Sequence, residues 1–356
     1  MIAFKHLKLI EVIDRKGSLS KAAKELNLSQ SALSHQLKQL EEILEIKVFH
    51  RVNNNLIFTE EGKEFRDYGA SILKEMAQLK TRMAEIKEFQ VNQYTHGYSL
   101  QETNRLYDQA STVADFIHWD SYWEKGTKIL EAGCGVGAQT QIIATNNPTC
   151  EITAVDISDR SITEAKKLIA TSDIKNVQFQ IADLRKLNFP DEYYDHIFVC
   201  FVLEHTPNPL QILTELKRVL KKDGTITVVE GDHGSTYFYP DSTTARKAVA
   251  AQVELQKKNG GNANIGRTLY PLLEQCGFQQ IAISPRQIYV DKSKPNLVDG
   301  FIRKTFTAMI KGVEEEAVSK GIISKNEMEE GIANLYRVAD TGGTFCYTFF
   351  KGVGVK

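Results

Sequence analysis

The stretch KILEAGCGVGAQT, residues 128–140, decides the fold of most of this 356-residue chain. It opens with an apolar run that predicts a short buried strand, and it continues into three glycines at alternate positions, Gly133, Gly135 and Gly137. Glycines at this spacing allow a sharp turn and a close approach between backbone and ligand. From Ala138 the apolar residues follow helical spacing. A strand, a glycine turn and a helix start in this order are typical of a nucleotide-type cofactor site.

Two carboxylates accompany this turn. Glu131 ends the first strand, and about twenty residues later a second apolar strand, 151–155, is followed by Asp156. A carboxylate at that place can accept both hydrogens of a ribose diol. Because the same loop also satisfies the G-x-G-x-x-A pattern of nicotinamide-binding enzymes, a nicotinamide site is the first alternative.

Residues 131–137, EAGCGVG, resemble the E-x-G-x-G-x-G loop of class I S-adenosylmethionine-dependent methyltransferases. Three later segments follow in that family's order: ADL at 182–184 after a third strand, DHIFVCFVLEH at 195–205 with the "LEH" turn of small-molecule members, and LTELKRVLKKDGTITVVEG at 213–231. Four matches in register favour this family over a nicotinamide enzyme. The resemblance implies an α/β fold with a Rossmann-like seven-stranded sheet, and S-adenosyl-L-methionine as the cofactor.

The resemblance also implies a set of cofactor-binding residues in loops and at strand ends. They are Glu131, Gly133, Gly135, Gly137, Asp156, Asp183, Leu184, Cys200 and Tyr98. Glu131 is expected to face the methionine ammonium through the loop, Asp156 to bind the ribose, and Asp183 with Leu184 to lie at the adenine. The segment 96–120 resembles the lid helices of this class, in which Tyr98 and Tyr107 close over the cofactor.

Methyl transfer asks little of the protein, because the cofactor carries its own leaving group. The enzyme holds the methyl in line with a nucleophile and, where needed, removes a proton. The candidate catalytic residues are His205 at the carboxyl end of the fourth strand, Glu204, which orients it, and His233 after the fifth strand. Glu204–His205 and Asp232–His233 also suggest a metal site, but no i, i+4 histidine pair supports it, so no metal is expected.

Two helical insertions, 241–275 and 292–340, surround a sixth strand at 279–290, and a seventh strand follows at 345–353. These insertions predict a cap over the site. Their aromatic and apolar side chains favour a fairly large, partly apolar acceptor.

The first sixty residues have a different pattern. Apolar residues at helical spacing, a polar turn at 27–29 and a third helix from Gln30 predict a helix-turn-helix. The stretch GSLSKAAKELNLSQSALSHQLKQLEEIL, 17–44, with an F-x-R at 49–51 and a T-x-x-G at 59–62, resembles the winged DNA-binding domain of LysR-type regulators. That resemblance implies double-stranded DNA as a partner.

The third helix is then the recognition helix. Its expected DNA contacts, with one from the wing, are Ser31, Ala32, Ser34, His35, Gln36, Lys38 and Arg51. They offer short polar groups, an amide that can pair with adenine and a small apolar surface for a thymine methyl. The side chains expected to face the core are Leu33, Leu37, Leu40 and Ile43. The alternative is a helix-turn-helix that has become a protein-contact module.

The predicted domains are a DNA-binding domain at 1–58, a long linker and dimerisation helix at 59–93, and a methyltransferase domain at 94–356. The helix carries apolar residues at steps of three and four, so it needs a partner. In LysR-type proteins that partner is a second copy, which predicts a homodimer. The alternative is packing on the chain's own methyltransferase domain.

Composition restricts the other classes. No apolar run approaches the roughly twenty residues of a membrane span, which argues against a membrane protein. Five cysteines without C-x-x-C pairing, and an amphipathic start without a signal-peptide pattern, predict a cytoplasmic protein. The net charge is only −1, so the prediction of DNA binding depends on motif geometry.

Three functions fit these features. The first is a methyltransferase acting on a small organic molecule, fused to a DNA-binding transcription-regulator domain. The second is a LysR-type transcription factor that uses the methyltransferase fold as an S-adenosylmethionine sensor. The third, DNA base methylation, is disfavoured because CFVL at 200–203 is not the [DN]-P-P-[YF] motif that grips a flipped base.

Overall fold

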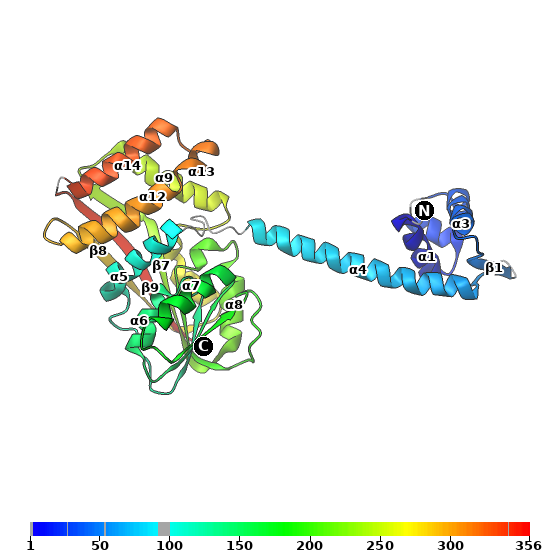
Figure 1. Ribbon diagram of the computed structural model, residues 1–356, viewed down its shortest axis with the longest axis horizontal. Coiled ribbons are helices and arrows are strands. Elements are labelled where there is room, and N and C mark those ends of the chain that lie inside the picture. Colours follow the sequence, from blue (N-terminus) through cyan, green and yellow to red (C-terminus); the bar gives the residue numbers. More distant parts are fainter. Residues whose placement is uncertain (1–2, 27, 53–54, 92–99, 341) are drawn as a thin grey trace. The chain divides into compact units, whose positions relative to one another are not determined.

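The computed structural model describes residues 3–26, 28–52, 55–91, 100–340 and 342–356 (Figure 1). Its contacts divide the chain into two units, Met1–Gln90 and Val91–Lys356, which are described separately below.

The first unit is a winged helix-turn-helix followed by a long helix. Its elements are α1 (Phe4–Lys16), α2 (Leu19–Glu25), α3 (Gln30–Leu44), β1 (Phe49–Val52), β2 (Asn55–Phe58) and α4 (Glu60–Val91). Serines begin the second and third helices: Ser18 Oγ accepts the Lys21 N–H at 3.2 Å, and Ser29 Oγ accepts the Ala32 N–H at 3.1 Å. The antiparallel pair β1–β2 is the wing.

The core of this unit confirms three of the four apolar positions expected on the recognition helix. Leu33 and Leu40 are fully buried and Leu37 is nearly so. Ile43 was expected to face the core, and this is wrong, because its side chain is 40% exposed. Ile43 lies in the last turn of α3, where it lines an open hollow beside His6 instead of packing under α1.

A capped joint connects the wing to α4. The Thr59 hydroxyl donates to Lys47 O at 2.6 Å, and Thr59 Oγ1 accepts the Gly62 N–H at 2.9 Å. A Cβ on Gly62 would lie 2.1 Å from Val48 O, so only glycine lets the helix start this close to the strand. The joint ties the start of α4 to the DNA-binding core.

One face of α4 is apolar and exposed within its own unit. The side chains concerned are Tyr68, Ile72, Met76 and Leu79, between 45% and 71% exposed. They follow one another at steps of four, four and three, so they form one stripe. The side chains of Met83 and Ile86, which would extend the stripe, lie outside those that the structure describes.

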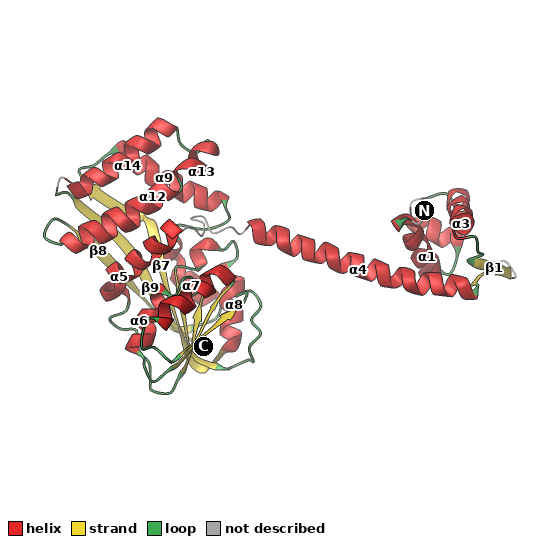
Figure 2. Ribbon diagram, in the orientation of Figure 1, coloured by secondary structure: helices red, strands yellow, loops and turns green. Residues whose placement is uncertain are grey.

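Within the described part of the second unit, seven strands form one sheet (Figure 2). They are β3 (Lys128–Ala132), β4 (Glu151–Asp156), β5 (Val177–Ile181), β6 (Tyr194–Cys200), β7 (Leu220–Tyr239), β8 (Gln279–Val290) and β9 (Thr344–Val355). Their order is β5-β4-β3-β6-β7-β9-β8. Strands β3 to β7 are parallel, and β9 runs antiparallel to both neighbours. This confirms the predicted α/β class with its Rossmann-like sheet.

Helices of this unit connect and cover the strands. They are α5 (Leu100–Ile117), α6 (Ala138–Asn146), α7 (Asp159–Ala170), η1 (Leu203–His205), α8 (Pro209–Val219), α9 (Thr243–Lys258), η2 (Ile265–Thr268), α10 (Leu269–Gln275), α11 (Pro295–Leu297), the π-helix η3 (Val298–Thr307), α12 (Ala308–Gly312), α13 (Glu314–Ser319) and α14 (Lys325–Asp340). The predicted helical insertions therefore correspond to α9–α10 and α11–α14.

The two faces of the sheet have separate cores, because successive strand residues point to opposite sides. Ile129 and Phe198 belong to the core that packs under α5, α6, α9 and α14, whereas Leu130 and Ile197 belong to the core under α8 and α10. All four side chains are fully buried. The sheet is thus covered on both sides, as its near-continuous apolar strands require.

Strand β7 differs from the sequence prediction. The fifth strand was expected to end near Gly231, with His233 in a following loop, and this is wrong because β7 continues to Tyr239. Its second half pairs with β9, with an irregularity in register between Asp232 and Tyr237. His233 lies in this irregular part of β7, where its N–H donates to Ala263 O at 3.0 Å.

Candidate cofactor and acceptor site

The glycine loop lies between β3 and α6, at the carboxyl end of the central strands. A Cβ on Gly133 would lie 2.5 Å from Val202 Cγ2, and one on Gly137 would lie 2.9 Å from Ala165 Cβ. These two glycines are therefore required by packing within the protein. Gly135 is different: a Cβ there meets no protein atom within 4 Å, although its φ of +52° also favours glycine. The loop leaves open space beside Gly135 alone.

Asp156, the last residue of β4, faces this loop. Its Oδ2 accepts the Gly135 N–H at 2.8 Å and its Oδ1 accepts the Ser158 N–H at 2.9 Å. Burial raises the pKa of Asp156, and the backbone donors oppose that effect. Because each carboxylate oxygen has two lone pairs, both oxygens keep capacity for a further donor such as a ribose hydroxyl.

Glu131 lies in β3, just before the glycine loop, and is almost fully buried, with 2% of its surface exposed. Its Oε2 has no hydrogen-bond partner among the described residues. Burial raises the pKa of Glu131 to about 8. A buried carboxyl with a free oxygen fits a cationic group of a ligand, because that cation would supply the missing partner.

The remaining cofactor candidates occupy neighbouring positions. Asp183 follows β5 and holds the Arg185 guanidinium at 2.8 Å, while Leu184 is buried beside it. Cys200 ends β6, and burial raises the pKa of its thiol well above the usual value. Tyr98 lies outside the described residues. The Tyr107 hydroxyl of α5 donates to Val136 O of the glycine loop at 3.4 Å, as expected of a lid helix.

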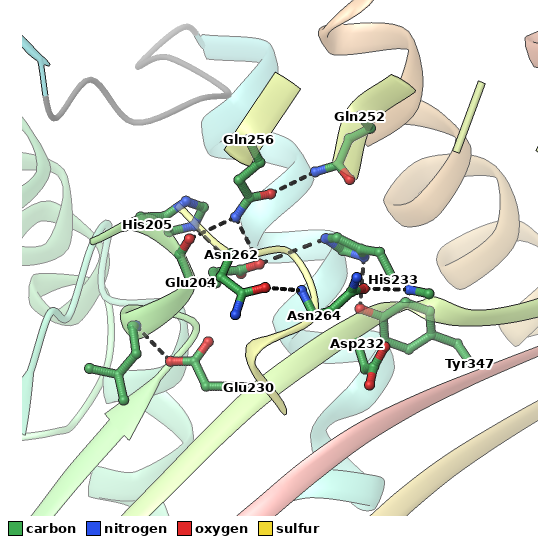
Figure 3. A network of polar contacts seen from close by, with 12 residues as sticks. Glu204, His205, Glu230, Asp232, His233, Gln252, Gln256, Asn262, Asn264 and Tyr347 are labelled. Carbon is green, nitrogen blue, oxygen red and sulfur yellow. Dashed lines mark hydrogen bonds and ion pairs between the residues drawn. The ribbon is translucent and has the colours of Figure 1, made fainter. Parts of the chain in front are cut away.

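The candidate catalytic residues meet at the end of β6. Glu204 and His205 lie in η1, and Figure 3 shows the Glu204 carboxylate between the rings of His205 and His233. Glu204 Oε1 lies 3.5 Å from His205 Nε2, and Glu204 Oε2 lies 3.7 Å from His233 Nε2. The sequence placed these residues on two strands, and the structure brings all three together.

His233 and Glu204 are buried more deeply than His205. Their side chains are 8% and 10% exposed, against 17% for His205. Burial lowers the pKa of His233, partly offset by Glu204. His233 Nδ1 lies 2.8 Å from the Tyr347 hydroxyl on β9.

Three residues that support this cluster have no motif of their own. Gln256 of α9 donates from Nε2 to Glu204 O at 3.0 Å and to Glu204 Oε2 at 3.3 Å. Glu230 of β7 accepts the N–H groups of Val202 and Leu203 through Oε1, which fixes the turn into η1. Glu230 and Tyr347 are far along the chain from the residues that they contact. No short sequence motif therefore connects them to the cluster.

Asp232 was considered as part of a metal site because it precedes His233, but in the structure it forms an ion pair. Both of its oxygens accept from the Arg267 guanidinium, at 2.6 and 2.7 Å, and its side chain is buried. It therefore anchors η2 to β7. No group of three or more metal-ligating side chains is found among the residues that the structure describes.

The recognition helix presents its predicted residues toward solvent. Ser31, His35 and Lys38 are exposed, and Ala32, Ser34 and Gln36 are half-buried. Ser31 Oγ lies 3.0 Å from the capping Ser29 Oγ. Arg51 lies in β1, and its side chain is not among those described.

Comparison with known families assigns both units. Residues 123–280 match the model of a methyltransferase domain, and residues 4–63 match the model of bacterial regulatory helix-turn-helix proteins of the LysR family. The chain therefore carries a methyltransferase domain and a LysR-family DNA-binding domain. Both domain resemblances that the sequence indicated are confirmed by these matches.

Relatives are similar over the methyltransferase part. An uncharacterised methyltransferase of Schizosaccharomyces pombe is 30% identical over 154 residues, 42% of this chain and 55% of that protein. A demethylmenaquinone methyltransferase of Listeria monocytogenes is 25% identical over 158 residues, 42% of this chain and 65% of that protein. This chain thus spans less than two thirds of either relative's length.

Solved structures match a larger share of this chain. A Haemonchus contortus phosphoethanolamine N-methyltransferase matches 69% of this chain and 52% of its own, with 14% identity and a TM-score of 0.44. The YcgJ protein of Bacillus subtilis matches 70% of this chain and 98% of its own, with 16% identity and a TM-score of 0.44. In the described residues, none of the helices combines the length and apolar character needed to cross a bilayer.

Proposed function

We propose that this protein transfers a methyl group from S-adenosylmethionine to a small organic acceptor, and that its N-terminal domain binds double-stranded DNA. The observation that carries the first part is the open space at Gly135, whose N–H donates to Asp156, together with the buried Glu131 carboxyl, whose Oε2 has no partner among the described residues. A cation at Glu131 and a diol at Asp156 match the methionine and ribose parts of the cofactor.

In this proposal each carboxyl group has one role. Glu131 faces the methionine ammonium through the loop, and Asp156 accepts the ribose hydroxyls. Asp183 with Leu184 borders the adenine, while Cys200 contributes an apolar wall. Its raised thiol pKa argues against a nucleophilic role for Cys200.

The acceptor end of the site is the cluster around Glu204. Bound S-adenosylmethionine supplies a methyl group and a neutral thioether leaving group. His205, supported by Glu204, takes a proton from the acceptor as the acceptor's lone pair forms the new bond to the methyl carbon. The Phe306 and Tyr347 rings lie 6.3 and 5.7 Å from the His233 ring, which favours an acceptor with an apolar body.

The N-terminal domain is proposed to act as a homodimer in the cytoplasm. The exposed apolar stripe of Tyr68, Ile72, Met76 and Leu79 supports pairing of two α4 helices. A two-fold dimer places two recognition helices in successive major grooves. Ser34, His35, Gln36 and the other predicted contacts of α3, with Arg51 of the wing, would then read a partly palindromic site.

Calorimetry with S-adenosylmethionine tests the cofactor assignment. Gly135→Val fills the open space and Asp156→Ala removes the ribose acceptor, so each is expected to weaken binding at least about tenfold. Gly126→Val is the matched control, because Gly126 also has positive φ and open space but precedes β3. Unchanged affinity in both site variants would refute the assignment.

A sensor that binds the cofactor without turnover is the second candidate function. Labelled methyl from S-adenosylmethionine, followed into a metabolite extract of the source organism, separates the two. An enzyme labels a metabolite and loses this activity by orders of magnitude in His205→Ala, with cofactor binding retained. If no metabolite is labelled but the cofactor changes the affinity for DNA, the sensor is correct.

A further inference from the structure

The buried cluster contains more groups than proton removal requires. Proton removal by a histidine requires only that ring and one carboxylate to orient it. In this cluster Glu204 also faces His233, and His233 in turn faces Tyr347. His233 and Tyr347 are both buried. Buried polar groups of this kind are costly unless each is satisfied, so their arrangement calls for a role.

The direction of the hydrogen bonds follows from chemistry. His233 Nε2 lies 3.7 Å from Glu204 Oε2, beyond hydrogen-bond distance, but a carboxylate only accepts, so its charge favours the neutral ring with the proton on this nitrogen. Nδ1 is then an acceptor, and the Tyr347 hydroxyl at 2.8 Å donates to it. Burial raises the pKa of Tyr347 well above its usual value, which keeps this hydroxyl protonated.

The fold makes room for this hydroxyl. Gly231 pairs with Phe349 across β7 and β9, and a Cβ on Gly231 would lie 2.4 Å from the Tyr347 oxygen. Gly231 has an ordinary backbone conformation, so no positive φ explains this glycine. The space it leaves is occupied by the donor to His233.

The side-chain amide of Gln256, which also contacts Glu204, has a defined orientation. Gln256 Oε1 accepts from Gln252 Nε2 at 2.8 Å, which directs the Gln256 amide nitrogen toward Glu204. The Asn262 N–H donates to Glu204 O at 2.8 Å. Gln256 thus holds the Glu204 carboxylate at Oε2, Gln256 and the Asn262 N–H hold its backbone carbonyl, and Oε1 lies 3.5 Å from His205 Nε2.

We infer that Tyr347 and His233 are positioning residues, which fix the Glu204 carboxylate so that it orients His205 as the proton acceptor. The inference rests on the proposed methyl transfer, and it divides roles between two histidines that the sequence treated alike. His233 has its proton fixed on Nε2 and its other nitrogen occupied by Tyr347. His233 cannot accept a proton at Nδ1 without losing the hydrogen bond from Tyr347. His205 is the more exposed ring.

Nitrogen-15 NMR of the full chain, labelled at its eight histidines, tests the arrangement without any acceptor. His233→Gln and His205→Gln identify the two rings by loss of their signals. We expect the wild-type His233 ring as a single tautomer with the proton on Nε2. Tyr347→Phe, which removes only the hydroxyl, should give a mixture of tautomers. Gly231→Ala should do the same by displacing that hydroxyl, whereas the exposed Tyr289→Phe should have no effect.

The charged groups around His233 are Glu204 and His205 from η1 and Arg105 from α5. None of them changes in Tyr347→Phe, so a tautomer change reports the lost hydroxyl. Methyl transfer to the metabolite extract should fall roughly tenfold in Tyr347→Phe, with unchanged S-adenosylmethionine affinity and wild-type rate in Tyr289→Phe.

The outcomes separate the inference from the proposed function. A His233 ring with its proton on Nδ1, or an unchanged tautomer in Tyr347→Phe, overturns the inference. A changed tautomer with unchanged transfer overturns the positioning role. Absence of transfer in wild type overturns the proposed function, while the tautomer result still decides whether the hydrogen bonds run as described.

Discussion

Replacing the buried Glu131 by glutamine should stabilise the protein while weakening cofactor binding. The carboxyl is almost fully buried, its Oε2 has no partner among the described residues, and burial raises its pKa from 4.5 to about 8. The neutral acid and the amide have nearly the same shape. The substitution therefore removes an ionisable group with little change in packing.

The magnitude follows from proton linkage. A folded-state pKa above the unfolded value means that the native state keeps a proton which the unfolded chain releases above pH 4.5. The resulting loss of stability is absent below pH 4.5, grows with pH, and is complete near pH 8. At pH 7 the interval is 2.5 pH units, and at 1.36 kcal/mol each it amounts to about 3 kcal/mol, an upper limit. Glu131→Gln should recover much of it.

Tryptophan fluorescence provides the assay, because Trp119 and Trp123 are the two tryptophans of the chain and both lie in the methyltransferase unit. Urea unfolding at pH 5 and pH 8 without cofactor should show equal stability near pH 5 and a more stable Glu131→Gln variant at pH 8. Calorimetry should show at least about tenfold weaker S-adenosylmethionine binding in the variant. Wild-type binding at pH 7 should release a proton, measured in buffers of different ionisation enthalpy. Parallel pH profiles of the two proteins would refute the reasoning.

Three further predictions concern other parts of the chain. Ser34→Glu places a carboxylate toward the major groove and should abolish operator binding in a mobility-shift assay, with an unchanged circular dichroism spectrum; retained binding would contradict the proposed recognition face. Leu79→Glu puts a charge in the apolar stripe of α4 and should shift the full chain from dimer to monomer in analytical ultracentrifugation, whereas Lys63→Glu on the same helix should not. Arg267→Leu leaves the buried Asp232 carboxylate without its partner and should lower the stability of the methyltransferase unit by about 2 kcal/mol, read from tryptophan fluorescence; an unchanged unfolding midpoint would contradict this.

Sequence reasoning succeeded where structure depends on local pattern. The runs that form β3, β4, β5 and β6 are short, carry regularly placed apolar residues and are followed by turn residues, so their limits could be predicted closely. The glycine loop and Asp156 were predicted with them, since the same twenty or so residues carry both strand and ligand signals.

Sequence reasoning failed where contacts between residues far apart in the chain override the local conformational preference of a segment. The segment 231–236 contains glycine, aspartate and serine, which favour a loop, yet pairing with β9 at Gly231 and Asp232 and again from Tyr237 keeps it within one strand, β7. Tyr347 lies 114 residues from His233, and Gln256 lies 52 residues from Glu204, so no local spacing could connect them. Ile43 illustrates the same limit at a helix end, where periodicity continues after the neighbouring helix has ended.

The capped joint at Thr59 has a consequence for how the DNA-binding domain could evolve. Because the helix start is fixed to the wing through Lys47, Val48 and Gly62, the angular phase of every later residue of α4 is set by counting from this point. Each residue inserted after the joint would rotate the apolar stripe by about 100° about the axis of α4, relative to the recognition helix α3. Insertions of seven residues nearly restore the phase and only lengthen the spacer, whereas an insertion of two turns the stripe almost to the opposite side. In the proposed dimer, changes in length within this helix would therefore alter in discrete steps which half-site spacing the two subunits can bridge.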